Sequence, residues 1–467
     1  MGAFFLGAFL VAPLFCFLGG FRPRYPRDMP NSDDQNPRSG AHAEFYQIVM
    51  AAVYHADGLW GEATFDLYAR DMPVDHGYLV AAGIEEAVQG ALSLGFTDKD
   101  VAWLKQQSVF NRASDRFWES LLDLSFQGDV YALPEGSVFF PGEPVLRITA
   151  PLPQAVLLET RLIQQISHAV ATATRASRLA DASGGRTLWD FGSRRLPGPE
   201  AALLSARASV IGGAAGTTCS QAGGRWGLRM MGTLSKSYLA AYQDDRAGLD
   251  AFALHFPDVH YLELPDGTPD SAVAELARLD KHVRIVRVDS QDLVSASRDV
   301  RRALDRAGLQ EVRILGSGSL DEQRLHRLDL EDAPVDMVAI GRSLASGTAG
   351  SAMAYRLAEI WRGVTPEPVT RPGGAKYPGL KQVIRFPDRD LICLEDEVFV
   401  LKMSGHEPRL VPWVQAGGRV RGREHAEDCS DRRLVELAAL SSGVRRLKQP
   451  EGWPVSISDR LAALTLG

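Results

Sequence analysis

The chain has 467 residues, of which 45% are hydrophobic, so it is long enough for two or three domains with ordinary cores. Its formal net charge of −7 excludes a general nucleic-acid binder, which needs a basic face to neutralise phosphates. The four cysteines are too far apart to indicate a disulfide framework or a structural zinc site, and they favour a reducing, cytoplasmic compartment (Cys16, Cys219, Cys393 and Cys429).

The N-terminal segment conflicts with that location. Ala3–Phe21 is almost continuously apolar and approaches the length needed to span a bilayer. Basic residues do not precede it but follow it, an order that would leave the rest of the chain in the cytoplasm (Arg22, Arg24 and Arg27). Alternatively, the protein starts at Met29 and the stretch is an over-extended reading frame. Because Pro30–Gly40 is rich in turn-forming residues, we expect residues 1–40 to be a disordered extension, with membrane association left open.

Residues 41–150 predict an N-terminal α+β domain. Helical periodicity between Phe45 and Leu94 is interrupted by a short strand, Ala63–Tyr68, and a second helical region covers Asp98–Leu124. Val130–Ile148 is rich in β-formers and is punctuated by Pro and Gly turns.

The pattern of expected secondary structure changes after residue 150. Thr160–Ala182 is helical in pattern, and it is followed by strands and helices that alternate at a spacing of roughly 25 residues, which is typical of parallel βα units. The expected strands are Thr187–Trp189, Leu228–Met231, Val283–Val288, Val312–Leu315 and Met337–Ile340, with helices at Leu293–Ala307 and Asp321–Leu328. We therefore predict an α/β protein: an irregular β/α barrel over residues 151–365, and a C-terminal segment, 366–467, that packs with the N-terminal domain.

Two successive βα loops predict a phosphate site. In such barrels the loops at the carboxyl ends of the strands carry the chemistry, and the last two often bind phosphate. Ser317 and Gly318 lie in the first loop, and Gly341 and Arg342 in the second. Glycine allows a close backbone approach, and N–H groups at a helix start favour an anion. One such loop alone is more often a tight turn.

Polar and aromatic residues in or after two other strands suggest binding sites for further parts of the substrates. Arg287, Asp289 and Asp292 suit ribose hydroxyls or a Mg²⁺ that bridges to phosphates, although both acids could simply cap a helix. Phe191 and Arg194 suit a flat ring that bears a carboxylate, since the ring can stack while the guanidinium binds the acid. A pair of surface arginines is the alternative there.

These motifs carry a family resemblance. The chain resembles the nicotinate phosphoribosyltransferases, type II enzymes that join nicotinate to 5-phosphoribosyl-1-pyrophosphate (PRPP). The resemblance covers nearly everything after residue 43, with the motifs in family order: EFYQIVMAAVY, GDVYALPEGSVFFPGEP, WDFGSRR, ARASVIGGAAGTT, MGTLSKS, RVDSQDL, GSGSLDE, AIGRSL and YPGLKQVIR.

The resemblance implies roles for individual residues. Tyr46 and Phe191 would sandwich the pyridine ring, with Tyr46 supplied by the partner subunit of a homodimer, and Arg194 would bind the carboxylate. Asp289 would act at the ribose. The loops of Gly318 and Gly341 would hold the 5′-phosphate, and the pyrophosphate, carried with Mg²⁺, would meet two arginines, Arg70 and Arg287.

Several positions depart from the family pattern. The family usually has a phosphoryl-accepting His, which couples ATP hydrolysis to synthesis, where this chain has Lys236. Lysine, with a reference pKa of roughly 10.4, is a charged clamp instead, so we expect no ATP coupling through it. Gln291 replaces a Gly, Arg342 a small hydroxyl residue, and the usual DTYDT is reduced to Glu263–Gly267, with acids at Glu263 and Asp266. Ala215 and Cys219 replace the usual acidic and Asn positions.

Three interpretations follow. The first is a phosphoribosyltransferase for nicotinate or a related aromatic acid, without ATP coupling. The second is a divergent paralogue that acts on a different aromatic acid or only binds a ligand, favoured by the altered DTYDT and by Gln291. The third is a barrel enzyme in which Lys236 forms a Schiff base with a phosphorylated carbonyl substrate. The third leaves Phe191 and Arg194 unexplained.

Overall fold

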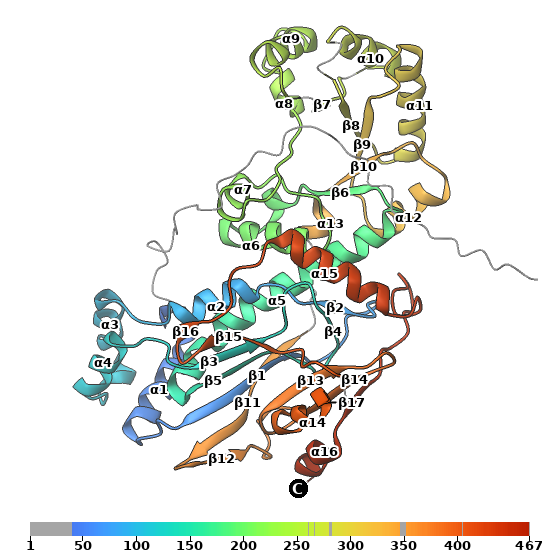
Figure 1. Cartoon of the computed structure of the whole chain (residues 1–467). Coiled ribbons are helices and arrows are strands. Elements are labelled where there is room, and N and C mark those ends of the chain that lie inside the picture. Colours follow the sequence, from blue (N-terminus) through green and yellow to red (C-terminus); the bar gives the residue numbers. More distant parts are fainter. Residues whose placement is uncertain are drawn as a thin grey trace, which may run out of the picture. The chain divides into compact units, whose positions relative to one another are not determined.

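The computed structural model describes residues 40–466, except for 260, 266, 280–282, 346–351 and 404 (Figure 1). These residues belong to one compact unit, which spans Pro37–Gly467. In the part described, no helix is both long and apolar enough to cross a membrane. The apolar stretch Ala3–Phe21 lies outside it.

A large antiparallel sheet forms the first layer, with the order β12-β11-β1-β5-β3-β15-β16. The interior strand β1 is buried along nearly its whole length, so both of its faces are covered. Distant parts of the chain build this sheet: β1 (Glu62–Ala69), β3 (Asp129–Ala132), β5 (Pro144–Pro151), β11 (Met353–Arg362), β12 (Thr365–Pro368), β15 (Val411–Gln415) and β16 (Gly418–Arg419).

Short helices share a core with this sheet: α1 (Phe45–Ala56), α2 (Ile84–Leu92), α3 (Asp98–Lys105) and α4 (Asp115–Leu122). The helical region expected over Asp98–Leu124 is two helices, because Ser114 caps the second one by accepting a hydrogen bond from the Phe117 N–H at 3.2 Å.

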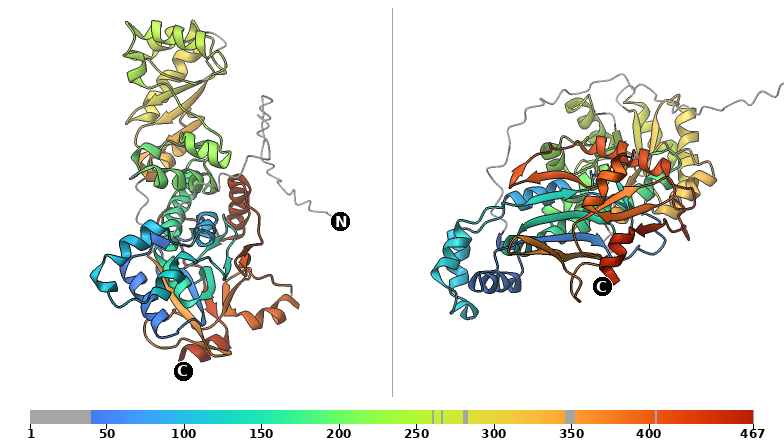
Figure 2. Two further views of the ribbon diagram at one scale, coloured as in Figure 1. Left: turned by 90° about the vertical axis from the view of Figure 1, so that its left-hand side faces the viewer. Right: turned by 60° about the horizontal axis from the view of Figure 1, so that its bottom comes forward.

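The long helix α5 (Leu152–Ala182) connects the two largest sheets, since it contacts β1 and β5 of the large antiparallel sheet and also β6 and α12 of the other part (Figure 2). It begins eight residues before the expected start at Thr160. Pro153 lies in its first turn, where a proline fits because that N–H has no partner within the helix.

The second layer is a parallel sheet with the order β6-β10-β9-β8-β7. Its strands are β6 (Thr187–Asp190), β7 (Tyr261–Glu263), β8 (Ile285–Asp289), β9 (Arg313–Ser317) and β10 (Met337–Ile340). Between and beside them lie α6 (Pro199–Ile211), α7 (Ser220–Trp226), α8 (Lys236–Leu239), α9 (Asp245–His255), α10 (Pro269–Ala277), α11 (Leu293–Arg306), α12 (Glu322–Leu330) and α13 (Arg342–Ala345). The predicted βα alternation is confirmed.

The two faces of the parallel sheet differ. Residues such as Val286 and Ile314 pack with the flanking helices. The alternate residues form one smaller apolar cluster, which takes members from every strand and from Met231 (Trp189, Tyr261, Ile285, Leu315, Met337 and Ala339). Both edge strands of this sheet, β6 and β7, contribute to the same cluster, and so does Met231. The sheet therefore curves around its inner face.

The α/β class with a second α+β part is therefore confirmed, whereas closure into a barrel is not. Two parallel bridges extend the sheet beyond β6, from Asp190 to Thr217 and from Thr217 to Met230. The strand expected at Leu228–Met231 is thus a single bridge. Among the described residues, no ladder joins β7 to Met230.

The range 151–365 assigned to the barrel also contains strands of the large sheet. β11 pairs with β1, from Ala69 opposite Met353 to Ala63 opposite Ile360. The smaller elements are β2 (Leu79–Val80), β4 (Val138–Phe139), β13 (Lys381–Arg385), β14 (Asp390–Leu394), β17 (Val455–Ile457), α14 (Val398–Met403), α15 (Ala426–Ala439), α16 (Asp459–Leu466) and 3-10 turns at Gly40–His42, Ser108–Phe110, Ser193–Arg195 and Glu395–Glu397.

Candidate functional site

Strand alternation places the polar residues of the parallel sheet on its inner face. Arg287 and Asp289 continue the inward series that Ile285 begins, Ser317 continues that of Leu315, and Glu263 that of Tyr261. Glu263, Asp289 and Ser317 are the last residues of their strands, and Arg287 lies two residues before the end of β8. The edge that usually carries the chemistry of such folds therefore collects a cation, two carboxylates and a hydroxyl.

Arg287 is the centre of this group. Its guanidinium donates to Ser317 Oγ at 3.0 Å, to Glu263 Oε2 at 3.1 Å and to Asp289 Oδ2 at 2.6 Å. A longer contact, 3.4 Å, reaches Thr233 Oγ1. The Arg287 side chain is 17% exposed and that of Asp289 is 45% exposed, so the cation is largely enclosed while this carboxylate is open to solvent.

Glu263 is the buried member of the group. Desolvation raises the pKa of its carboxyl, although Arg287 opposes that shift, and the charge of Lys236 opposes it too. Lys236 is exposed at the start of α8. Its positive charge is close enough to favour the ionised form of the Glu263 carboxyl. Asp266, the other acid of the reduced motif, lies outside the described residues.

The Gly318 loop is built by close backbone contact. Gly318 has φ of +128°, and a Cβ there would lie 2.1 Å from the Ser290 carbonyl oxygen. Only glycine fits, which brings the loop after β9 against the loop after β8. Gln291 lies beside this loop, where its Oε1 accepts from Arg324 at 3.1 Å. The same Arg324 donates to the Gly318 carbonyl at 2.8 Å, a contact that the sequence did not indicate.

The Gly341 loop lies against the aromatic loop. The Phe191 N–H donates to the Ile340 carbonyl at 2.8 Å, and a Cβ on Gly341 would lie 3.2 Å from the Phe191 oxygen. The Arg287 guanidinium lies 6.0 Å from the centre of the Phe191 ring. The predicted ring site and phosphate loops are therefore neighbours. Two exposed arginines lie just beyond these strand ends, Arg194 in the turn after β6 and Arg342 at the start of α13.

Two predicted site residues lie elsewhere. Tyr46 is the second residue of α1 and is 51% exposed, and Arg70 follows β1, where its N–H donates to the Ala352 carbonyl at 2.9 Å. Both belong to the part built on the large sheet. The structure thus gathers the predicted residues of the parallel sheet but does not show Tyr46 or Arg70 among them.

One buried carboxylate escaped the sequence analysis. Asp190 ends β6, is 3% exposed, and accepts hydrogen bonds from the Gly192 N–H at 2.7 Å and from Thr217 Oγ1 at 2.8 Å. Ala215 and Cys219, the two altered family positions, lie in the same segment as Thr217 and are held by their N–H groups, bonded to the Leu188 carbonyl and to Thr217 Oγ1.

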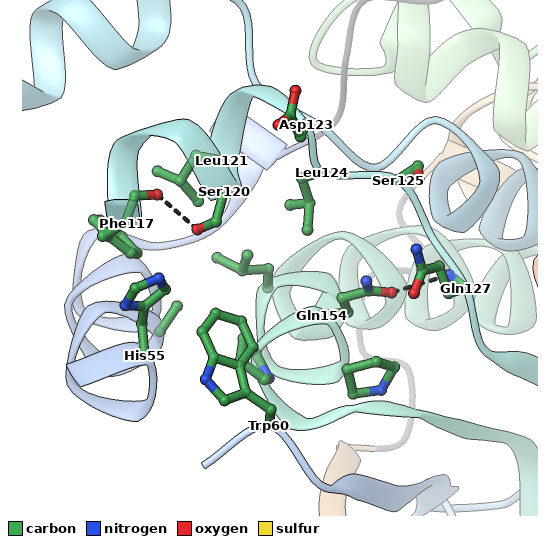
Figure 3. Close-up of a pocket in the computed structure, with 14 residues that line it drawn as sticks. His55, Trp60, Phe117, Ser120, Leu121, Asp123, Leu124, Ser125, Gln127 and Gln154 are labelled. Carbon is green, nitrogen blue, oxygen red and sulfur yellow. Dashed lines mark hydrogen bonds between the residues drawn. The ribbon is translucent and has the colours of Figure 1, made fainter. Parts of the chain in front are cut away.

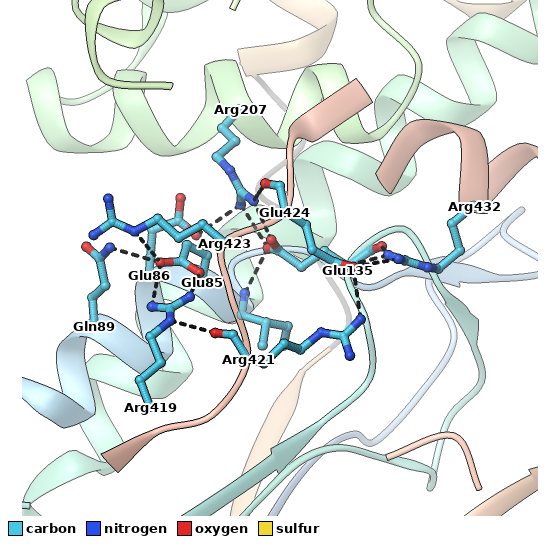
Figure 4. A network of polar contacts seen from close by, with 11 residues as sticks. Glu85, Glu86, Gln89, Glu135, Arg207, Arg419, Arg421, Arg423, Glu424 and Arg432 are labelled. Atoms are coloured by element: carbon cyan, nitrogen blue, oxygen red, sulfur yellow. Dashed lines mark hydrogen bonds and ion pairs between the residues drawn. The ribbon is translucent and has the colours of Figure 1, made fainter. Parts of the chain in front are cut away.

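A buried ionic network anchors α6, the helix that follows the Phe191 loop (Figure 4). Arg207 on α6 forms a two-pronged pair with Glu135 at 2.9 and 2.5 Å and also meets Glu86 at 3.4 Å. Burial lowers the pKa of Arg207, but the two acids together raise it above its ordinary value. The side chains of Arg207 and Glu135 are 2% and 0% exposed, so this network fixes α6 firmly.

A cavity of about 400 Å³ lies in the other part of the chain (Figure 3). His55, Trp60, Phe117 and Leu157 are among its walls, which α1, α4 and α5 contribute. None of the predicted site residues lines it. We place the site at the strand ends because charged side chains converge there, whereas this cavity is mainly apolar.

Comparisons with known proteins find relatives along most of the chain. Residues 42–167 match the nicotinate phosphoribosyltransferase N-terminal domain. Nicotinate phosphoribosyltransferase pncB2 of Mycobacterium tuberculosis is 34% identical over 430 residues, 90% of this chain and 91% of the relative. The Bacillus subtilis nicotinate phosphoribosyltransferase is 32% identical, over 76% of each chain.

Solved structures also resemble this chain in fold. The human nicotinic acid phosphoribosyltransferase has a TM-score of 0.78 at 25% identity, covering 91% of this chain and 99% of the human one. A Pyrococcus furiosus nicotinate-nucleotide pyrophosphorylase shares the fold, with a TM-score of 0.70 at 21% identity. A paralogue with a different role is not favoured by these relatives. Likeness along nine-tenths of both chains shows that this protein is a member of the nicotinate phosphoribosyltransferase family.

Proposed function

We propose that this protein transfers a phosphoribosyl group from PRPP to nicotinate, giving nicotinate mononucleotide and pyrophosphate. One observation carries the proposal: Arg287 is bonded to Glu263, Asp289 and Ser317 beside Phe191, in a chain related to nicotinate phosphoribosyltransferases over 90% of its length.

The chemistry follows from these groups. The pyridine nitrogen forms a bond to C1 of the ribose as the bond from C1 to the pyrophosphate oxygen breaks, through a cationic, oxocarbenium-like sugar. Asp289, the more exposed of the two carboxylates, suits the ribose and its developing positive charge. Arg287 neutralises the charge that gathers on the leaving pyrophosphate. The family resemblance would add Arg70 as a second cation, although the structure places Arg70 with the large sheet and not beside Arg287. The nitrogen is already a nucleophile, so placement matters more than activation.

The substrates are held by separate loops. The Ser317–Gly318 and Gly341–Arg342 turns present backbone N–H groups and a cation to the 5′-phosphate. Phe191 offers a face on which the pyridine ring stacks, and Arg194 a guanidinium for its carboxylate.

Mg²⁺ enters bound to PRPP in this proposal. Within the described residues no group of three or more His, Cys, Asp or Glu side chains could hold a metal. Magnesium needs few protein ligands when phosphates supply the others, and Asp289 provides one exposed carboxylate.

We further propose that ATP does not drive the reaction. In the resemblance the phosphoryl-accepting His is replaced by Lys236, whose charge lies close enough to act on Glu263. A lysine there binds an anion such as pyrophosphate rather than accepting a phosphoryl group.

We also propose a reducing, cytoplasmic compartment, which the free thiols of Cys219, Cys393 and Cys429 support.

The test measures pyrophosphate release from PRPP and Mg²⁺ by protein lacking residues 1–28, with and without nicotinate and ATP. We expect nicotinate-dependent release that ATP does not change. Strong stimulation by ATP would refute the role given to Lys236. PRPP binding without turnover of nicotinate would favour another aromatic acid, and no PRPP binding would refute the transferase itself.

The shared homodimer site is also a proposal, supported by the exposed apolar residues of α1. Phe45 is 44%, Tyr46 51% and Val53 51% exposed on that helix. If Tyr46 serves the partner subunit, Y46A and R287A are each inactive but complement one another when refolded together. Random pairing restores about one quarter of the activity, because half of the dimers are mixed and each has one intact site. No recovery, or a monomer by light scattering, would contradict the shared site.

A further inference from the structure

Asp190 occupies an unusual place at the end of β6. Its neighbours in the chain, Trp189 and Phe191, belong to the inner face, so Asp190 projects to the outer face, away from the substrates. The carboxylate is nonetheless 3% exposed and carries two hydrogen bonds, from the Gly192 N–H and from Thr217 Oγ1. A buried carboxylate is costly unless it is bonded, so both donors matter.

These bonds join the two loops that follow β6 and the Thr217 bridge. The Thr218 N–H donates to the Asp190 carbonyl at 3.0 Å, and Thr217 Oγ1 in turn accepts from the Cys219 N–H at 3.1 Å. On its other side the turn meets the phosphate loop, because a Cβ on Gly192 would lie 3.1 Å from the Gly341 carbonyl oxygen. The turn is thus fixed between Thr217 and Gly341.

We infer that Asp190 is a positioning residue: its carboxylate fixes the Phe191–Gly192 turn between Thr217 and the Gly341 loop, and so sets the aromatic-acid site relative to the phosphate site. The inference rests on the proposed function for its kinetic consequence but not for its structural one. Asp190 touches no reacting atom. It acts through the backbone that carries Phe191 and Arg194.

The kinetic test compares D190A, T217V and D336A. Asp336 is the matched control, because its carboxylate also accepts a backbone N–H, from Ile314 at 2.7 Å, but at the amino ends of the same sheet. Misplacing the ring by about 1 Å should raise the nicotinate KM of D190A on the order of 10- to 100-fold, with a smaller change in the PRPP KM. T217V should behave alike, T217S should restore binding, and D336A should keep the wild-type KM.

The double variant D190A/T217V gives a sharper answer. Both changes remove the same hydrogen bond, so their effects on the nicotinate KM should not multiply. Multiplying effects, or a nicotinate KM raised equally by D336A, would overturn the inference. Should D190A fail to fold, D190N and T217V carry the comparison.

A structural readout separates this inference from the proposed function. In the protein without substrates, D190A and T217V should speed amide hydrogen exchange in residues 191–195 and 217–219, and D336A should speed it near Ile314 instead. A wild type that turns over no nicotinate would refute the function, while the exchange data would still decide the role of Asp190. Unchanged exchange at 191–195 in D190A would overturn that role.

Discussion

Arg287 and Glu263 are paired positions on neighbouring parallel strands, and the guanidinium lies 3.1 Å from the carboxylate. The pair is enclosed, since their side chains are 17% and 5% exposed. Burial raises the pKa of Glu263, and Arg287 offsets part of that shift. The site therefore has a fixed cation whose remaining donors are aimed at Asp289 and Ser317, an arrangement suited to stabilising charge that develops during a reaction.

Replacing Arg287 by lysine should damage the reaction although the charge remains. An ammonium has three donors on a flexible stem and cannot reproduce the fork that meets Glu263, Asp289 and Ser317. We expect kcat/KM for PRPP to fall on the order of 100-fold or more in R287K, by steady-state pyrophosphate release. R284K, just before the same strand at its amino end, is the control. Equal activity of R287K and wild type would contradict the central role of Arg287.

The Gly318 loop predicts a difference between two glycine variants. In G318A the new Cβ would lie 2.1 Å from the Ser290 oxygen, at φ of +128°. Gly308 also has a positive φ, +76°, but nothing lies within 4 Å of its Cβ position. G308A should cost about 1 kcal/mol of unfolding free energy from backbone strain alone, whereas G318A should cost more and should also raise the PRPP KM. Urea unfolding and kinetics check both, and equal behaviour of the two variants would count against the close contact.

Much of the parallel sheet could be predicted from the sequence. The expected strands Val283–Val288, Val312–Leu315 and Met337–Ile340 fall within two residues of β8, β9 and β10, because apolar runs and short loops define such strands locally. The sequence also located four residues that the fold brings together in or just after these strands: Phe191, Arg287, Asp289 and Ser317.

The remaining features depend on contacts between distant residues. The residues of Met353–Arg362 do not by themselves indicate that this strand pairs with β1. The pairing partner depends on which strands of the sheet still have an unpaired edge. Asp190 was not selected from the sequence, because its neighbours Trp189 and Phe191 face inward and drew attention to the inner face. Alternation along β6 predicts that the Asp190 side chain points to the outer face, and this was the one sequence feature that indicated its position. The bonds of Arg324 to the Gly318 loop carried no sequence signal.

The buried network on α6 predicts a large loss of stability from a single change. R207M leaves Glu135, which is 0% exposed, without its counter-charge, and removing one partner of a buried pair costs about 3–5 kcal/mol. The exposed pair of Arg306 and Asp270, whose side chains are 60% and 67% exposed, is the control, and R306M should cost at most about 1 kcal/mol. E135Q/R207M should recover part of the loss, because the fully buried position 135 then carries no unpaired charge. Similar unfolding midpoints for R207M and R306M would contradict the burial of this network.

Asp190 should give the unfolding free energy a specific pH dependence. Burial raises the pKa of its carboxyl to about 6 from 3.8, although the Gly192 and Thr217 bonds oppose that shift. Between these two values the folded state binds the proton more tightly than the unfolded state does. The stability that Asp190 contributes is therefore present below the lower pKa and is lost as the pH rises through the upper one.

The measurement is the difference in unfolding free energy between wild type and D190N, by urea denaturation from pH 4 to pH 7. The amide does not titrate, so other groups cancel in the difference. We expect wild type to lose on the order of 2–3 kcal/mol relative to D190N across this range, with no further change at higher pH. A flat difference, or one that favours wild type as the pH rises, would mean that hydrogen bonding to the ionised carboxylate outweighs its desolvation.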